Sequence, residues 1–308
     1  MVQARRNSAL LGIALWLSAG GIKAAETDRP QPFKSGVDLV TVDVCVRDAA
    51  GHFLPTLSAD DFLILENGAA QEVRFIERGD ALPLRVLLLI DGSSSMNGRK
   101  LGRAREAAAQ FAARLSADDK MEIITFNEKA SIALAFEDER ARAAETLHHI
   151  SASGMTALNE ALLVAVNELR RVRTVYGSEA REVVIVLSDG EDTASVIGFE
   201  EILRAVRSSG ALVYTLSLRT SPSGEWLGAN WPLLQLAADT GGRAVAVPRL
   251  DALEELYHDI VTEVRHLYRL GYVSSNSRRD GTWRSVSVRM RSGDARIQTR
   301  AGYYASSR

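Results

Sequence analysis

The feature that most constrains the fold is a series of short apolar runs after Pro83 that alternate with amphipathic stretches. The runs read RVLLLI, MEIITF, VVIVLS, ALVYTLSL and RAVAV, and most of the stretches between them have helical spacing. Short, continuous apolar runs are typical of strands that are buried on both faces. The alternation therefore predicts an α/β fold, with a doubly wound, mostly parallel sheet and helices on both of its faces.

The sheet is expected to depart from regular alternation at one strand. The segment SIALAF follows MEIITF after only NEKA, which is too short for a crossover connection, so this strand should be antiparallel. After the last run, apolar residues at core spacing predict a closing helix from about Asp251 to Tyr268.

Both flanks of this region have the alternation of half-buried strands. Val40, Val42, Val44 and Val46 share one face of a segment that ends at Arg47. FLILENG and QEVRFIER enclose an Asn-Gly turn signal and predict a hairpin with a loop longer than two residues. TWRSVSVRMR and ARIQTRAGYY predict further strands near the carboxyl end.

Neither flank has enough strands to bury a core alone. We therefore predict one small all-β sandwich, built from residues 36–80 and 269–305. The α/β domain, residues 82–268, is expected to be inserted between these two parts.

The first residues have the pattern of a secretory signal. Arg5 and Arg6 precede the apolar segment ALLGIALWLSAGGI, and small residues follow at Ala24 and Ala25. The segment is short for a membrane span of about 20 residues, so we expect a cleaved signal peptide over residues 1–25. The protein should then be periplasmic, on the cell surface or secreted.

Charge and cysteine content exclude two classes. Removal of the signal leaves 34 basic and 39 acidic residues, which is no basic footprint for nucleic acid. Cys45 is the only cysteine and cannot form an internal disulfide. It falls on the strand face of Thr41 and Asp43, where an inert sheet cysteine is expected and a partly exposed thiol is the alternative.

A dense group of oxygen-bearing side chains follows the first apolar run, in the sequence IDGSSSM. A phosphate loop requires G-x-x-x-x-G-K-[ST], but after Gly92 the next glycine, Gly98, comes one residue too late. A nucleophile elbow requires G-x-S-x-G, but Met96 stands in the place of the second glycine. Both readings therefore fail on the motif itself.

A metal site fits this loop better. Asp91, Ser93 and Ser95 alternate just beyond a strand end, although a helix-capping serine cluster would explain that spacing alone. Thr156 precedes a later helix, and Asp189 ends another buried strand. Loops after parallel strands meet at one sheet edge, so we expect these oxygens to converge on a hard cation such as Mg²⁺.

This pattern resembles the von Willebrand factor type A domain with its metal-ion-dependent adhesion site. The family pattern D-x-S-x-S, then a threonine, then an aspartate, is matched in order and strand context over roughly residues 82–268. Ser94 and Met155 stand where the family often has glycine, and neither removes a ligand. The flanks resemble a group of exported bacterial proteins built around this domain.

The resemblance implies a non-enzymatic protein-binding or adhesion module. Ser93 and Ser95 would bind the cation directly, Thr156 directly or through water, and Asp91 and Asp189 largely through water. A Glu or Asp carboxylate of a partner protein would complete the coordination. Mg²⁺ is the expected ion, with Mn²⁺ and Ca²⁺ as alternatives.

Two other functions stay open. A metal-assisted hydrolase would need a general base, for which Glu191 and Asp192 are candidates, although a solvated acidic loop explains them more simply. The second of these functions is that of a structural envelope protein. For the partner-binding rim we expect Glu191, Asp192 and Trp226, which lies in the long loop 219–232.

Overall fold

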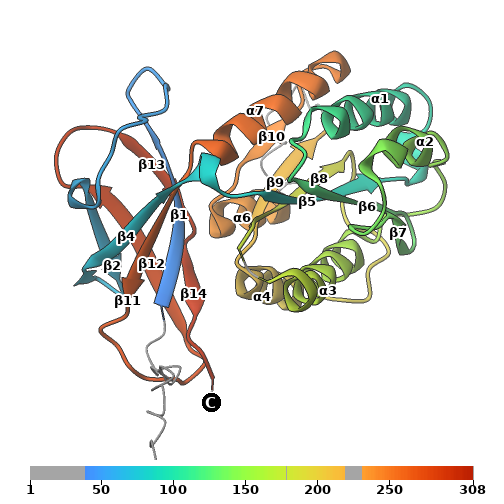
Figure 1. Cartoon of the computed structure of the whole chain (residues 1–308). Coiled ribbons are helices and arrows are strands. Elements are labelled where there is room, and N and C mark those ends of the chain that lie inside the picture. The colour runs from blue at the N-terminus through green and yellow to red at the C-terminus, as the bar shows by residue number, and fades with distance from the viewer. Residues whose placement is uncertain (1–38, 178, 219–230, 308) are drawn as a thin grey trace, which may run out of the picture. The chain divides into compact units, whose positions relative to one another are not determined.

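The central sheet has six strands. The computed structural model describes residues 39–177, 179–218 and 231–307 (Figure 1). The strand order is β10-β9-β8-β5-β6-β7, and every pair is parallel except β6 with β7. This confirms the mostly parallel sheet and its antiparallel edge strand. The strands are β5 (Leu84–Asp91), β6 (Lys120–Phe126), β7 (Ala130–Leu134), β8 (Arg181–Ser188), β9 (Leu212–Ser217) and β10 (Ala244–Ala246).

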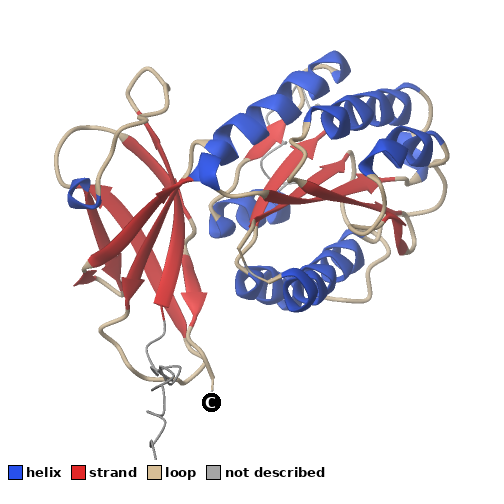
Figure 2. Cartoon of the chain, viewed as in Figure 1, coloured by secondary structure: helices blue, strands red, loops and turns tan. Residues whose placement is uncertain are grey.

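Helices cover both faces of this sheet, as predicted (Figure 2). Their apolar faces form two separate cores with the two faces of the strands, because every second strand residue points to the same side. One core contains α1 (Arg99–Arg114), α2 (Ala143–His148) and α7 (Leu253–Arg265). The other contains α3 (Leu158–Tyr176), α4 (Phe199–Ser209) and α6 (Trp231–Thr240).

The prediction that the last helix extends to Tyr268 was wrong. α7 ends at Arg265, and Tyr268 is the first residue of β11 (Tyr268–Val273). Tyr268 pairs with Val44 on one side and with Arg78 on the other. Pairing on both sides satisfies the backbone groups that another helical turn would have satisfied.

The two flanks of the chain build two further antiparallel sheets, ordered β13-β1-β11-β4 and β14-β12-β2-β3. Each sheet mixes strands from both ends of the chain, which confirms the predicted all-β part. Residues 37–308 form one compact unit, so the boundaries 36–80, 82–268 and 269–305 stay predictions. The strands are β1 (Leu39–Arg47), β2 (Phe62–Glu66), β3 (Ala69–Gln71), β4 (Val73–Arg78), β12 (Trp283–Met290), β13 (Arg296–Thr299) and β14 (Gly302–Tyr304).

The predicted long-loop hairpin was wrong in its pairing. β2 pairs with β3 across the two-residue turn Asn67-Gly68, whose φ angles are 47° and 83°. Positive φ at both positions is the geometry of the type I′ turn that Asn-Gly favours. β4 then leaves this sheet and pairs with β11. ARIQTRAGYY divides in the same way, into β13 in one sheet and β14 in the other.

β1 uses both of its faces. Val40, Val42, Val44 and Val46 lie in the sandwich core, as the alternation predicted. Cys45 is 1% exposed and belongs to the core formed with α1 and α7. Burial raises the pKa of its thiol to about 11, so the inert alternative is the one that the structure supports.

The predicted signal peptide, residues 1–25, lies outside the described part of the chain. Among the residues that are described, we find no helix with the length and apolar character needed to cross a membrane.

Candidate metal centre

Asp91 lies at the carboxyl edge of the six-stranded sheet, beside Ser188. β5 and β8 pair in parallel with Ile90 opposite Leu187, so the residues that follow emerge side by side. The Ser188 hydroxyl donates to Asp91 Oδ2 at 2.5 Å, and the Ser93 amide donates to Asp91 Oδ1 at 2.8 Å. Asp91 is fully buried, and these two bonds fix its orientation.

Two serine hydroxyls and Asp189 form a short series of neighbouring oxygens. Ser93 Oγ is 3.0 Å from Ser95 Oγ, which donates to Asp189 Oδ1 at 2.6 Å. Around a Mg²⁺ ion with metal–oxygen distances of about 2.1 Å, adjacent octahedral ligands lie about 3.0 Å apart. The spacing of these three oxygens therefore fits neighbouring positions around such a cation.

Backbone hydrogen bonds tie the loop that carries Thr156 to the other two loops. The Ser94 amide donates to Gly154 O at 3.0 Å, and the Thr193 amide donates to Thr156 O at 2.8 Å. The Thr156 amide in turn donates to Thr193 Oγ1 at 3.1 Å. A Cβ placed on Gly190 would lie 3.5 Å from Thr156 Oγ1, so the loop after Asp189 runs directly past this hydroxyl. All five predicted ligands therefore belong to one set of connected loops.

The electrostatics of this edge favour a cation. Burial raises the pKa of Asp91 above its ordinary value, the hydrogen bonds from Ser188 and Ser93 oppose that rise, and the Asp189 carboxylate adds to it. Two carboxylates in a buried position repel each other, and a divalent ion beside them offsets both the repulsion and the loss of hydration.

Lys100 belongs to this site and was missed by sequence reasoning. Its ammonium forms an ion pair with Asp189 and donates to Ser95 O at 3.3 Å. It lies in the first turn of α1, where the helix dipole disfavours a cation. A lysine in that turn is a weak signal for an acidic partner on another loop, and it was available in the sequence.

The predicted rim residues have different surroundings. Glu191 is exposed. Asp192 caps α3, because its Oδ2 accepts from the Asn159 amide at 2.8 Å, and its Oδ1 accepts from the Ser195 amide at 2.9 Å. Trp226 lies outside the described residues.

The donor set points to a hard cation. Across residues 39–177, 179–218 and 231–307, no three His, Cys, Asp or Glu side chains gather as a metal site of their own. The donors at the sheet edge are instead serine and threonine hydroxyls with two carboxylates, and oxygen ligands suit Mg²⁺, Mn²⁺ or Ca²⁺.

Comparison with known families agrees with this geometry. A family model described as the von Willebrand factor type A domain matches residues 86–191. The chain contains a von Willebrand factor type A domain. The matched segment runs from β5 past the end of β8, so it includes all five predicted ligand positions.

Solved structures of von Willebrand factor type A proteins share the fold. The protein from Catenulispora acidiphila has a TM-score of 0.50 and 14% identity, covering 82% of this chain and 76% of that chain. Proximal thread matrix protein 1 from the mussel byssus, solved with a zinc-occupied MIDAS motif, has a TM-score of 0.50 and 17% identity, covering 65% and 49%. At these identities the likeness shows the fold alone.

Curated relatives are longer than this chain. The pig (Sus scrofa) inter-alpha-trypsin inhibitor heavy chain H4 is 32% identical over 154 residues, which is 47% of this chain and 16% of that protein. The human heavy chain H6 is 30% identical over 258 residues, which is 77% of this chain and 18% of that protein. The matched part of the chain thus spans less than a fifth of the length of these relatives.

Proposed function

We propose that this von Willebrand factor type A domain holds a divalent cation at the carboxyl edge of its sheet and, through it, binds an acidic residue of a partner protein. The observation that carries the proposal is the convergence at Ser95, whose Oγ lies 3.0 Å from Ser93 Oγ and 2.6 Å from Asp189 Oδ1. The zinc-occupied MIDAS motif of the mussel protein supports a cation in a domain of this fold.

The residues divide into two roles. Ser93, Ser95 and Thr156 would offer neutral hydroxyl oxygens to the ion. Asp91 and Asp189 would balance its charge, largely through water molecules. When bound, the cation supplies an electrophilic anchor for a partner carboxylate. We propose Mg²⁺, with Mn²⁺ and Ca²⁺ as alternatives, because the donors are hard oxygens.

Charge at the site suits an anionic partner. Two carboxylates balance one divalent ion, and the nearby Lys100 ammonium adds a positive charge. The approach of a Glu or Asp side chain is therefore favoured rather than repelled. Among the proposed ligands, Ser95 is exposed, so the ion would be reachable from solvent.

The loops around the site offer apolar contacts as well. Met155 is 53% exposed and Val196 is 95% exposed, on the loops that carry Thr156 and Asp189. We propose that the partner surface combines a carboxylate with apolar side chains, and that Glu191, Asp192 and Trp226 contribute to the rim. Both oxygens of Asp192 already accept backbone amides, which supports binding over hydrolysis. Export to the cell envelope or beyond is part of the proposal.

Replacing Ser95 with alanine is expected to lower Mg²⁺ affinity by at least roughly tenfold, and Asp91→Ala by roughly a hundredfold, because each removes an oxygen that positions the ion. Isothermal titration calorimetry measures both. Ser94→Ala is the matched control, since Ser94 is exposed and only its backbone is bonded within the site. Equal affinity of Asp91→Ala and the parent protein would refute the assignment.

Binding of the partner should depend on the Ser95 hydroxyl oxygen. A pull-down from the native envelope fraction is expected to recover a specific protein with magnesium and to lose it with a chelator. The Ser95→Ala bait should recover little of it even in magnesium, whereas the Ser94→Ala bait should match the parent. A partner retained equally by all baits and in chelator would rule out cation-mediated binding.

A further inference from the structure

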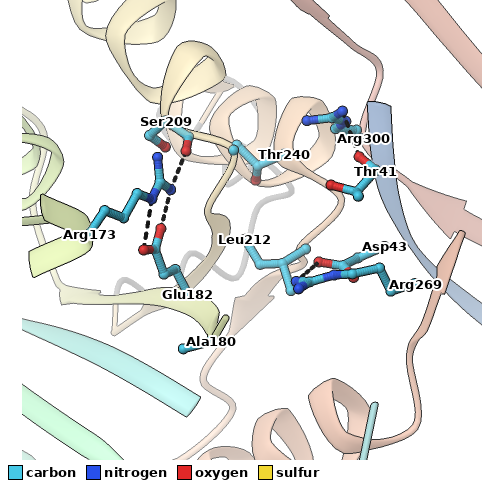
Figure 3. Close-up of a pocket in the computed structure, with 11 residues that line it drawn as sticks. Thr41, Asp43, Arg173, Ala180, Glu182, Ser209, Leu212, Thr240, Arg269 and Arg300 are labelled. Carbon is cyan, nitrogen blue, oxygen red and sulfur yellow. Dashed lines mark hydrogen bonds and ion pairs between the residues drawn. The ribbon is translucent and has the colours of Figure 1, made fainter. Parts of the chain in front are cut away.

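A polar cavity lies at the amino end of the sheet strands, opposite the predicted metal ligands. Its volume is about 250 Å³, and its lining includes Glu182 at the start of β8 and Leu212 at the start of β9. Thr41 and Asp43 of β1 form the facing wall (Figure 3). The predicted ligands Asp91 and Asp189 lie at the carboxyl ends of β5 and β8, so this cavity is a separate site.

Three arginines line the cavity, and two of them are paired. Arg173 donates to Glu182 and to the carbonyl of Ser209. Arg269 donates to both carboxylate oxygens of Asp43, at 3.0 and 3.1 Å. Figure 3 shows these contacts on two sides of the cavity.

Arg300 is the third, and it has no ion pair among the described residues. Its Nη2 donates to Thr41 O at 2.7 Å, and its guanidinium lies 5.5 Å from the centre of the Tyr303 ring. Its Nε is fully buried and has no hydrogen-bond partner. Burial lowers the pKa of Arg300, and Asp43 opposes that effect. A buried N–H donor without an acceptor is costly, whereas the rest of the Arg300 side chain is only half-buried and can be reached from the cavity that it lines.

The charges around the cavity do not balance. Asp43 also accepts from Arg181 at 3.0 Å, and Glu182 also lies 3.7 Å from Arg85. Each of these carboxylates therefore faces two arginines. Glu77 lies opposite Arg269 in the strand register and adds one negative charge. Among the residues that line the cavity, three arginines (Arg173, Arg269 and Arg300) face two carboxylates (Asp43 and Glu182), which leaves one positive charge in excess. Arg85 and Arg181 pair with the same two carboxylates from outside the lining.

We propose that this cavity, called here the arginine cavity, binds a small oxyanion through Arg300, with Arg173 and Arg269 on its other sides. The guanidinium group presents planar, paired donors that match carboxylate and phosphate oxygens. The volume is below the range of about 300–1,000 Å³ for drug-sized ligands. The ligand class is therefore a phosphate or a small carboxylate rather than a large cofactor.

One purely structural role competes with this proposal. α3, α4 and α6 end near the cavity, at Tyr176, Ser209 and Thr240, and the carboxyl end of a helix carries a partial negative charge. Arg173 meets the end of α4 directly through Ser209 O. Arg300 donates instead to a carbonyl of β1, but its Nη1 also lies close to Gly210 at the end of α4. If the helix ends already balance the arginines, added anions will not stabilise the fold.

The test is anion-dependent stability of the full chain. Melting temperature is measured in inorganic phosphate, in malonate and in sodium chloride at matched ionic strength. Phosphate or malonate at about twenty times its dissociation constant is expected to raise the melting temperature by roughly 4 °C above the chloride value. The more effective of the two anions identifies the ligand class, and calorimetry gives its affinity.

Arg300→Met is expected to lose at least tenfold in anion affinity. Arg300→Lys keeps the charge but not the paired donors, so it should bind the anion weakly. This variant provides the measurement if the methionine variant does not fold. Arg289→Met is the matched control, because Arg289 is an exposed arginine of β12. Mg²⁺ affinity, measured in parallel, should be unchanged in all three. No stabilisation beyond chloride, or equal stabilisation in the Arg300 variants, would overturn the proposal.

Discussion

Replacing Arg181 with methionine is expected to lower the free energy of unfolding by about 3–5 kcal/mol. Arg181 is completely buried at the start of β8. Its Nη2 donates to Asp43 of β1 at 3.0 Å, and its Nη1 donates to Val264 O in α7 at 2.7 Å. Burial alone would raise the pKa of Asp43, but Arg181 and Arg269 outweigh it and hold that pKa below its usual value. The substitution leaves a largely buried carboxylate with one cation, and it removes the side-chain donor of Val264 O.

Urea unfolding measures the loss as a lower midpoint with an unchanged slope. Arg170→Met on α3 is the matched control, since Arg170 is exposed, and it should change stability by less than about 0.5 kcal/mol. In the double variant Asp43→Asn/Arg181→Met the two losses should not add, because both substitutions disrupt the same contact. A loss below about 1 kcal/mol for Arg181→Met would show that this arginine does not stabilise the junction.

Replacing Glu122 with glutamine is expected to stabilise the protein at alkaline pH, by up to roughly 5 kcal/mol. Glu122 lies within β6 and is completely buried. Neither of its carboxyl oxygens makes a hydrogen bond of ordinary geometry. Burial raises its pKa to about 8, the Glu168 and Glu137 carboxylates add to the rise, and the Phe136 backbone and Arg171 oppose it.

The direction of the pH effect follows from proton uptake. Between an unfolded pKa of about 4.5 and a folded pKa of about 8, the folded state binds more protons than the unfolded state. Glu122 therefore costs no stability at pH 4. Its unfavourable contribution to the free energy of unfolding grows as the pH rises through this interval, and it is largest above pH 8. Glu122→Gln should remove this slope and leave stability near pH 4 almost unchanged.

Unfolding midpoints between pH 4 and pH 9 provide the measurement. Glu145→Gln on α2 is the control, because Glu145 is exposed, and its profile should follow that of the parent protein. The stability difference between the parent protein and Glu122→Gln should therefore change between pH 5 and pH 8.5. An unchanged difference would show that Glu122 is ionised at little cost.

The α/β architecture could be predicted because its evidence is local. Each apolar run from Leu84 onward indicates a strand that is buried on both faces. Each amphipathic stretch indicates a helix with one face packed against the sheet. The antiparallel strand β7 followed from loop length alone, since NEKA cannot span a crossover. The candidate ligands were predicted because parallel strands deliver their following loops to the same edge.

Strand pairing in the flanks could not be read in the same way. QEVRFIER was predicted as one strand after a longer loop, but Gln71 ends β3 and the residues from Val73 onward form β4, and these two strands lie in different sheets. Alternation shows which side chains face a core, but it does not show which neighbouring strand supplies the backbone hydrogen bonds. Tyr268 was wrongly assigned to a helix for a related reason. A buried large side chain fits a helical position and a strand position equally well, so burial alone did not show where the helix ends.

The sequence by itself determined the fold class, the covered faces and the loop positions of the candidate metal ligands, because these follow from periodicity and short spacings. Only the tertiary structure revealed the ion pair of Lys100 with Asp189, the junction between Arg181 and Asp43, and the buried Arg300 Nε without a hydrogen-bond partner. These groups are 89 residues apart in the first case and 138 in the second. Charge interactions depend on distance and burial after the chain has closed on itself, and neither quantity is written in local sequence.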